Sequence, residues 1–508
     1  MVSTLLTGAD AISSVRTACV IDLVCRGILV LVGVDLLTFK KVDPGALHLV
    51  LLILNRLVKG NDMSIEHLLV GVAKRKITPK PGCELAGFDA RKGVATGIHD
   101  ELFARALVIR DGDKAVVFVS LDLIGIPQHF TNSVRKAAHA LTGIAELDII
   151  LSATHTHCGP VTIKHFFNGD QELDTDYMVG LEKLTVAAIL EAFERREPAV
   201  LKTGLVPVHG VASNRRTESG KPIDEQAGVI LAENLSGDVR AILVNYPCHP
   251  TVLGPNTLEV TRDFPHYLAE RLTEHFGDGM TPLYFNGAEG DLSIGHKSYL
   301  SAVGVIAPFR TFEKAREIGT QLAQCVIDSL DTLATEAPKI TSEHSIISLP
   351  LKAYAPREEM KRTKDAALAS LNATGEQTSQ QDLLLRRQDW LFARIEDYYS
   401  SLYEEVKTDP VLRVEVSVVR VGDTAIVSLP GEVFVEIGLA IRRRSPLPRT
   451  MIFGLANNYI GYVPTIEQAK SSGYEVVASR VTPEASLVLE EGAVDLLRRV
   501  SSRSQVVL

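Results

Sequence analysis

The chain has 508 residues, with 53 Lys and Arg against 62 Asp and Glu, so its net charge is −9. Hydrophobic residues at 46% and charged residues at 23% are ordinary for a globular protein, which excludes wholesale disorder. The acidic balance argues against a nucleic-acid partner. Six Cys without a C-x-x-C pair argue against a disulfide scaffold and against a Cys-rich zinc site.

Residues 1–62 are unlike the rest of the chain. Residues 18–38 form an apolar run of the length that spans a bilayer, about 20 residues, but the run contains three charged side chains. Three interpretations of this extension stay open: a poorly ordered start-site artefact, a membrane anchor, or a helical accessory. We expect a cytoplasmic protein if translation starts at Met63, and a membrane-associated or secreted protein if the apolar segment is real.

From Met63 onward, strand-like and helix-like segments alternate. Strands are expected from Leu68 and at 115–126, 147–153, 200–212, 227–246, 282–287, 412–430 and 451–457, and helices at 128–142, 175–195, 263–276, 311–334, 432–444 and 483–499. The pattern predicts an α/β fold with mixed β-sheets flanked by helices, forming a single large domain over 63–508. The highly charged residues 356–408 predict a solvated helical hairpin inserted in that domain.

The sharpest chemical signal is Thr-His-Thr-His-Cys-Gly-Pro at 154–160, directly after a buried strand. Residues i and i+2 of an extended chain point to the same side, so His155 and His157 can face one cavity. Two imidazoles there suit two metal ligands, or one ligand with an acid/base neighbour. The alternative is a pair of hydrogen-bonded polar residues in a turn. Cys158 is interpreted as a small turn residue rather than a nucleophile.

Further polar residues follow other predicted strands. His249 stands between two prolines, which favours a rigidly held ligand. Glu432 lies where a strand ends and a helix begins. Its carboxylate can point into a pocket, or it can interact favourably with the helix dipole. Tyr462 with Tyr474, Ser293 in a Gly-rich loop and Arg215 in a polar loop are unremarkable when each is taken alone.

Together and in order, these segments resemble the neutral (non-lysosomal) ceramidase family of zinc amidases. The motifs are VGVAKRKITP (70–79), GIHDELFARALVI (97–109), THTHCGP (154–160), NYPCHPT (245–251), GDLS (290–293), LPGE (429–432) and NNYIGYV (457–463), followed by Tyr474. The resemblance implies the fold of that family over the body of the chain.

The resemblance also implies a role for each matching residue. One catalytic Zn²⁺ per chain would be held by His155, His249, Glu432 and Tyr462. His157 would act beside the metal-bound water, Arg215 and Tyr474 would stabilise the transition state, and Ser293 would contact the substrate near the scissile amide. Zn²⁺ lowers the pKa of bound water to about 7, which suits hydrolysis at neutral pH.

The chain departs from the family pattern in three places. It ends about 34 residues after Tyr474, which is too short for the C-terminal β-sandwich domain of the family. Cys158 replaces the usual Ser, and the loop at 290–295 differs from the family sequence. We therefore expect the metal chemistry to be retained more securely than the substrate.

The expected function is a zinc-dependent hydrolase that cleaves the N-acyl bond of ceramide-like sphingolipids. The alternatives are a zinc hydrolase or lyase for a more polar, sugar-like or small amide substrate, and a catalytically inactive binding protein. The expected partners are a small-molecule or lipid substrate and a membrane surface, with no nucleic acid. The oligomeric state is left open.

Overall fold

A computed structural model describes residues 67–164, 166, 173–375, 378–403 and 410–502. The predictions for residues 1–62 lie outside these ranges. The described residues belong to one compact unit that begins at residue 66. No helix in these ranges is both long enough and apolar enough to cross a membrane.

The larger sheet has nine strands, in the order β11-β9-β8-β6-β1-β3-β4-β5, with β13 paired to β6. The strands are β1 (Leu68–Lys76), β3 (Phe103–Asp111), β4 (Lys114–Leu121), β5 (Ile149–Ala153), β6 (Glu197–Pro207), β8 (Gln226–Asn234), β9 (Val239–Tyr246), β11 (Thr281–Asn286) and β13 (Ala334–Thr335). The pairs β4–β5 and β9–β11 are parallel, whereas the other neighbours are antiparallel. The prediction of mixed sheets is confirmed.

The smaller sheet has the order β14-β15-β16-β18. Its strands are β14 (Ile340–Pro350), β15 (Val411–Val421), β16 (Thr424–Ser428) and β18 (Arg449–Phe453). Short strand pairs join the loops: β2 (Gly97–Ile98) with β10 (Glu259–Val260), β7 (Ser213–Asn214) with β12 (Leu292–Ser293), and β17 (Glu432–Val433) with β19 (Tyr462–Val463).

The two sheets share an apolar core because their strands alternate between two buried faces. On β4, Val116 and Phe118 belong to an apolar cluster between the two sheets, the inner cluster, which also contains Phe285 and Phe453. Val117 and Val119 point to the other face and belong to the cluster beneath the helices at 128–142 and 175–194. The ring of Phe453, from the smaller sheet, contacts two rings of the larger sheet. Its centroid lies 5.6 Å from that of Phe118 and 4.3 Å from that of Phe285, on which it stacks. The continuous apolar run on β4 is therefore a strand buried on both faces, as predicted.

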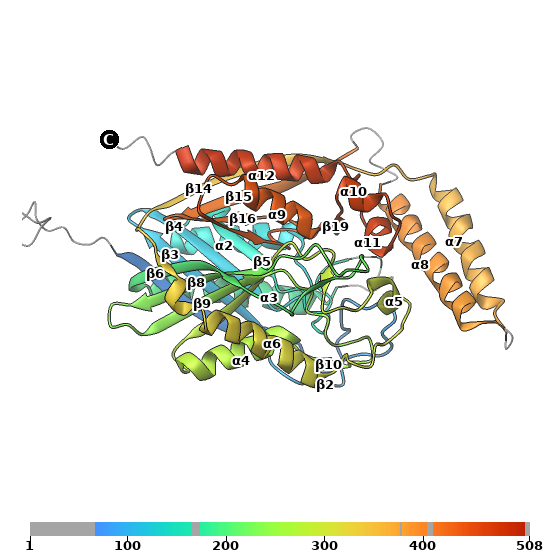
Figure 1. Ribbon diagram of the computed structural model, residues 1–508, viewed down its shortest axis with the longest axis horizontal. Coiled ribbons are helices and arrows are strands. Elements are labelled where there is room, and N and C mark those ends of the chain that lie inside the picture. The colour runs from blue at the N-terminus through green and yellow to red at the C-terminus, as the bar shows by residue number, and fades with distance from the viewer. Residues whose placement is uncertain (1–66, 165, 167–172, 376–377, 404–409, 503–508) are drawn as a thin grey trace, which may run out of the picture. The chain divides into compact units, whose positions relative to one another are not determined.

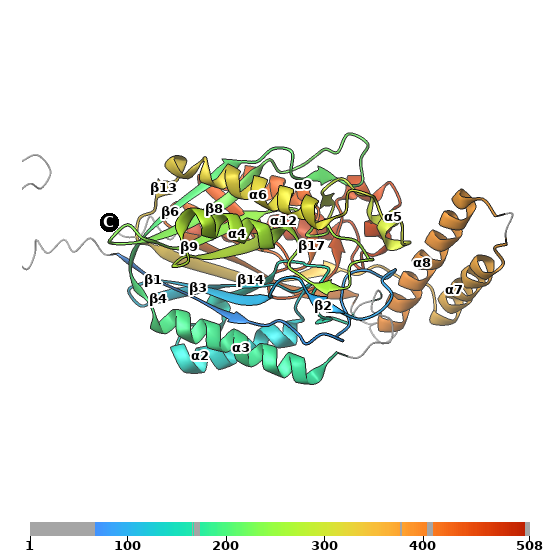
Figure 2. The ribbon, with the colours of Figure 1, turned by 90° about the horizontal axis from the view of Figure 1, so that it is seen from below.

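Helices cover the outer faces of both sheets (Figures 1 and 2). The larger sheet carries α2 (Gln128–Thr142), α3 (Thr175–Glu194), α4 (Phe264–Phe276) and α6 (Phe312–Ile327), and the smaller sheet carries α9 (Val435–Arg444) and α12 (Ala485–Ser502). The short helices are α5 (Ser298–Ala302), α10 (Ile466–Ala469) and α11 (Tyr474–Val477), with 3₁₀ turns at Glu146–Asp148 and Leu330–Thr332. This arrangement confirms the predicted α/β class.

The predicted hairpin is present as α7 (Arg357–Asn372) and α8 (Gln380–Tyr403), which lie side by side in both views (Figures 1 and 2). No described residue of α7 is buried, so solvation is the right description of that helix. One face of α8 is different, because Leu391, Ile395 and Tyr399 are buried in the core beneath the smaller sheet. Describing the whole hairpin as solvated is therefore wrong for α8.

Asn286, the last residue of β11, joins the ends of three strands. Its amide nitrogen donates to the carbonyl oxygens of Thr154 and Cys248, at 3.3 Å each, and its amide oxygen accepts from the Cys248 N–H at 3.1 Å. Its backbone carbonyl accepts from Gly454, which follows β18. The segments after β5, β9, β11 and β18 are therefore held together, and these segments carry the motifs singled out in the sequence.

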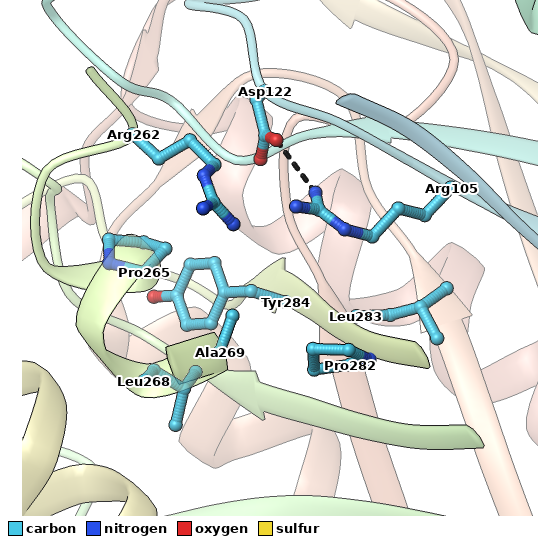
Figure 3. A pocket seen from close by; sticks show the side chains of 9 residues that line it. All are labelled: Arg105, Asp122, Arg262, Pro265, Leu268, Ala269, Pro282, Leu283 and Tyr284. Atoms are coloured by element: carbon cyan, nitrogen blue, oxygen red, sulfur yellow. Dashed lines mark hydrogen bonds and ion pairs between the residues drawn. The ribbon is translucent and has the colours of Figure 1, made fainter. Parts of the chain in front are cut away.

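The GIHDELFARALVI motif has a structural role in the fold. Asp100, which is 7% exposed, accepts from the backbone N–H and Nε of Arg262 at 3.1 and 3.0 Å. Arg105 pairs with Asp122 at 2.6 Å, and the two arginines line a small pocket between α4 and β11 (Figure 3). Burial raises the pKa of Asp100, but hydrogen bonding to His99 and the charge of Arg262 outweigh that effect and lower the pKa to about 2.

We predict that Asp100→Asn lowers the free energy of unfolding by about 2 kcal/mol at pH 6. Because the folded-state pKa is depressed, the contribution is present above the unfolded-state pKa of about 4 and is lost as the pH falls towards 2. Urea denaturation of both proteins between pH 6 and pH 2 checks this, and the difference should shrink over the lower part of that range. Asp113→Asn, at an exposed position, is the control. Equal midpoints for wild type and Asp100→Asn at pH 6 would contradict the prediction.

Candidate metal centre

Glu432 occupies the middle of the candidate site. It follows Gly431, whose φ is +74° and whose added Cβ would lie 2.4 Å from the Gly461 carbonyl oxygen, so a side chain is excluded there. The tight turn starts β17, where Glu432 pairs in register with Tyr462 of β19. The Glu432 side chain is 1% exposed, and the Tyr459 hydroxyl donates to its Oε1 at 2.6 Å. A buried carboxylate is therefore aimed into the interior.

His155 lies two residues after the end of β5 and faces the same carboxylate. Its φ is +72°, which is unusual for a residue with a side chain and costs on the order of 1–2 kcal/mol. Its Nδ1 lies 2.6 Å from the Ile124 carbonyl oxygen, and its Nε2 lies 3.5 Å from Oε2 of Glu432. The carbonyl fixes the tautomer with the proton on Nδ1, which leaves the Nε2 lone pair directed at the carboxylate.

His249 is held in the same way from the end of β9. Its Nδ1 lies 2.9 Å from the carbonyl oxygens of both Glu289 and Leu292, and its Nε2 lies 2.9 Å from Oε2 of Glu432. The imidazole is fully buried. A neutral imidazole has only one N–H, so it cannot donate on both sides at once.

The buried imidazole of His249 fits a bound cation better than a second proton. Burial and the charge of Arg215 lower the pKa of His249 to about 4, which disfavours the doubly protonated ring that could donate to both neighbours. With the proton kept on Nδ1, the Nε2 lone pairs of His155 and His249 and the oxygens of Glu432 form a set of nitrogen and oxygen donors. Such a set suits Zn²⁺, and the carbonyl contacts to Nδ1 are the usual support of a metal-binding His.

His157 lies between this donor set and the cavity above it. Its ring centroid is 4.8 Å from that of His155 and 6.1 Å from that of His249, and ligand atoms of the three lie within 4.8 Å of one another. Neither ring nitrogen has a hydrogen-bond partner among the described residues. Burial, followed by the neighbouring imidazoles, holds its pKa well below the usual range. The predicted approach of His155 and His157 is present, although the positive φ of His155 means that no extended strand produces it.

Arg215 forms an ion pair with Glu475, the residue that follows Tyr474 in the sequence. Arg215 Nε lies 2.7 Å from Oε1 of Glu475, and its Nη2 donates to the Gly290 carbonyl at 2.8 Å and to the Tyr462 hydroxyl at 3.2 Å. Burial lowers the Arg215 pKa, but the charges of Tyr462 and Glu475 outweigh that effect and raise it, so the guanidinium stays charged. The ring of Tyr474, next to Glu475, lies 5.9 Å from that of Tyr462.

A cavity opens over these side chains. Its lining residues include members of the predicted site together with loop and helix residues, namely Gly87, Phe88, Asp89, His157, Phe166, Arg215, Thr251, His296, Ser298, Ser301, Ala302, Leu391, Tyr462 and Tyr474. His155, His249 and Glu432 lie beneath it and are not part of the lining. Ser293 is buried and also absent from the lining: its hydroxyl donates to the His296 carbonyl and accepts from the Gly295 N–H.

Three residues of the site were not picked out in the sequence. The Tyr459 hydroxyl donates a hydrogen bond to Glu432, and Glu475 forms an ion pair with Arg215. A carboxylate oxygen of Glu289 lies within 4.8 Å of a ring nitrogen of His155 and of a carboxylate oxygen of Glu432. Each stands beside a recognised residue or motif, three residues before Tyr462, one after Tyr474, and directly before the GDLS loop. That adjacency was the only available signal.

Comparison with known proteins gives two concordant results. Residues 68–278 match the family model described as neutral/alkaline non-lysosomal ceramidase, N-terminal. Neutral ceramidase 2 of Arabidopsis thaliana is 34% identical over 118 residues, 22% of this chain, and a neutral ceramidase of Oryza sativa subsp. japonica is 32% identical over 102 residues, 19% of this chain. The matched segments span 15% and 13% of those relatives.

Solved structures share the fold. The crystal structure of neutral ceramidase from Pseudomonas aeruginosa matches with a TM-score of 0.69 at 20% identity, covering 86% of this chain and 75% of that one. A ceramidase complexed with C2 matches with a TM-score of 0.66 at 18% identity, covering 86% of this chain and 76% of that one. The resemblance seen in the ordered motifs is confirmed by the match of residues 68–278 to the N-terminal family model, and the chain shares the fold of these solved ceramidase structures.

Proposed function

We propose that this protein is a zinc-dependent amide hydrolase that cleaves the N-acyl bond of ceramide-like lipids. The observation that carries the proposal is the buried Glu432 carboxylate, faced by Nε2 of both His155 and His249 while their Nδ1 atoms are tied to carbonyls. This arrangement leaves three convergent donor groups whose lone pairs would be satisfied by a bound divalent cation.

His155, His249 and Glu432 would hold the zinc, with Tyr462 as the fourth ligand that the family resemblance implies. Tyr462 stands in register with Glu432, and its hydroxyl accepts from Arg215. Burial and the charge of Glu432 hold the pKa of Tyr462 well above its usual value, while the charged guanidinium of Arg215 lowers it, so the phenolate that a tyrosine ligand requires would depend on the bound cation. When bound, zinc supplies a Lewis acid and lowers the pKa of coordinated water.

The remaining polar residues have roles set by their positions. His157 lies at the cavity, its two ring nitrogens have no hydrogen-bond partner in the described part of the chain, and its pKa is depressed. It is therefore neutral at pH 7 and can take a proton from water and return it to the leaving amine. Arg215 keeps its charge at the cavity wall, and Tyr474 lies beside it. Together they would stabilise the negative charge that develops on the amide oxygen. Ser293 would act indirectly, by holding the loop that places His296 in the cavity.

The lipid assignment draws on the relatives and on the cavity wall. The matched plant proteins are named neutral ceramidases, and one solved neighbour is a ceramidase complexed with C2. In this chain Phe88, Phe166 and Leu391 give the cavity an apolar side on which an acyl chain can lie.

A polar substrate is the second candidate, because the same cavity also has a polar side. Asp89, Thr251, His296, Ser298 and Ser301 line it, which is an unusual number of hydrogen-bonding groups for a pocket that holds only hydrocarbon. A small N-acylated sugar or amino compound would use these groups. The first experiment below separates the two substrates.

We expect the full chain, loaded with zinc, to release fatty acid from a fluorescent short-chain ceramide and to bind one zinc per chain. His155→Ala should lose both the metal and the activity, because one of the three convergent donors is gone. Metal analysis and product chromatography check the two results separately. Zinc binding without fatty-acid release would retain the metal centre, discard the lipid, and favour N-acylated polar compounds as the substrate. Activity that survives in zinc-free His155→Ala would contradict the proposed chemistry.

We predict that Tyr459→Phe weakens zinc binding about 10- to 100-fold, the usual effect of removing a group that orients a metal ligand. The Tyr459 hydroxyl donates to Oε1 of Glu432 and its ring stacks on His155 at 6.4 Å, so the substitution frees the carboxylate but keeps the packing. Competition with a chelator measures the affinity. Tyr177→Phe, which removes a part-buried hydroxyl bonded to the Ile77 carbonyl, is the control and should leave the affinity unchanged.

We predict that Gly87→Ala lowers kcat by about 100-fold or more while the zinc content stays at one per chain. A Cβ at Gly87 would lie 2.4 Å from Cγ of His157, so the imidazole must move. Gly82→Ala is a matched control, because its φ of +92° imposes a similar strain but no atom of the described residues lies within 4 Å of its added Cβ. A Gly87→Ala enzyme as active as Gly82→Ala would remove His157 from the mechanism.

A further inference from the structure

Glu289 is a buried carboxylate that none of the roles above uses. It is fully buried, and neither of its oxygens has a hydrogen-bond partner among the described residues. Its ligand atom lies within 4.8 Å of those of His155 and Glu432. It lies in the turn between β11 and β12, and its own backbone carbonyl is the one that contacts Nδ1 of His249.

Such a side chain has no satisfactory state by itself. An ionised carboxylate has two oxygens that must accept hydrogen bonds, and a protonated one has an O–H that must donate. Glu289 has no partner of either kind within hydrogen-bond distance in the described part of the chain. It also lies close to a second buried carboxylate, Glu432, so like charges would oppose each other unless a cation lay between them.

We propose that Glu289 is a further ligand of the metal bound by His155, His249 and Glu432. This inference rests on the metal centre of the proposed function and adds a residue that the family ligand set implied by the motifs does not contain. Two carboxylates and two neutral imidazoles then provide four donor groups for a divalent cation. The unpartnered oxygens of Glu289 are then satisfied by the ion.

A second carboxylate changes which metals the centre accepts. Carboxylate oxygens suit Mn²⁺ and similar harder ions better than imidazoles do, so the extra oxygen ligand raises affinity for Mn²⁺ relative to Zn²⁺. Removing Glu289 should therefore weaken Mn²⁺ binding more than Zn²⁺ binding. A side chain that only packed against the site would not alter this ratio.

The test uses metal-free full-length protein and measures affinity for Zn²⁺ and Mn²⁺ by chelator competition. Glu289→Gln should weaken Zn²⁺ binding at least about tenfold, weaken Mn²⁺ binding further, and alter the visible spectrum of bound Co²⁺, which reports the number of ligands. Glu289→Leu is a second variant that removes the oxygens altogether and should weaken binding of both metals in the same order. In the metal-free state Glu289→Leu should also raise the melting temperature, because it removes a buried polar group that has no hydrogen-bond partner among the described residues.

Glu336→Gln is the matched control. Glu336 is also a buried glutamate, but its oxygens are bonded to Thr424, to Arg449 and to the Asp423 N–H. Its substitution should lower the melting temperature and leave both metal affinities unchanged. Unchanged Zn²⁺ affinity and an unchanged Co²⁺ spectrum in Glu289→Gln would overturn the inference, as would a wild-type protein that binds no metal. Because no substrate enters the measurement, a protein that binds metal but does not hydrolyse ceramide would leave the inference standing.

Discussion

The site depends on one electrostatic constraint, the burial of the Glu432 carboxylate. A buried charge is costly unless it is paired or bound to a metal. The chain brings Nε2 of His249 to 2.9 Å, Nε2 of His155 to 3.5 Å and the Tyr459 hydroxyl to 2.6 Å from this group. Since the two imidazoles are each fixed from behind by a carbonyl, they reach the carboxylate as lone pairs rather than as N–H donors. The cation proposed above would satisfy both the buried carboxylate and these lone pairs.

The backbone meets this constraint at the ends of strands that lie far apart in sequence. The Asn286 amide ties the segment that leads into His155 to the segment that leads into His249, and its backbone carbonyl receives the N–H of Gly454. Strain is accepted where the geometry demands it, as the φ of +72° at His155 shows. The shared core of the two sheets holds these turns in place, because the same strands that carry the motifs also carry the inner apolar cluster.

Sequence patterns predicted the elements well wherever the signal was local. The buried run on β4, the helices α2, α3 and α4, and the turn before Glu432 all depend on periodicity or on Gly and Pro within a few residues. What could not be predicted is contact between distant segments. The support that Glu475 gives Arg215 joins residues 260 positions apart, and the unpartnered state of Glu289 appears only once every neighbour is known. Nothing in the spacing of these glutamates distinguishes them from surface ones.

The charged hairpin shows the same division between local pattern and distant contact. Its composition predicts two solvated helices, and α7 is indeed a solvated helix. On α8, however, Leu391 lines the cavity and Arg394 pairs with Asp89, a residue of the cavity wall, while also donating to the Phe166 carbonyl. The polar and apolar sides of the cavity are therefore both positioned in part by this insertion. His155, His249 and Glu432 come from the ends of strands, whereas these wall contacts come from the hairpin, so the insertion contributes to the shape of the cavity above the buried carboxylate.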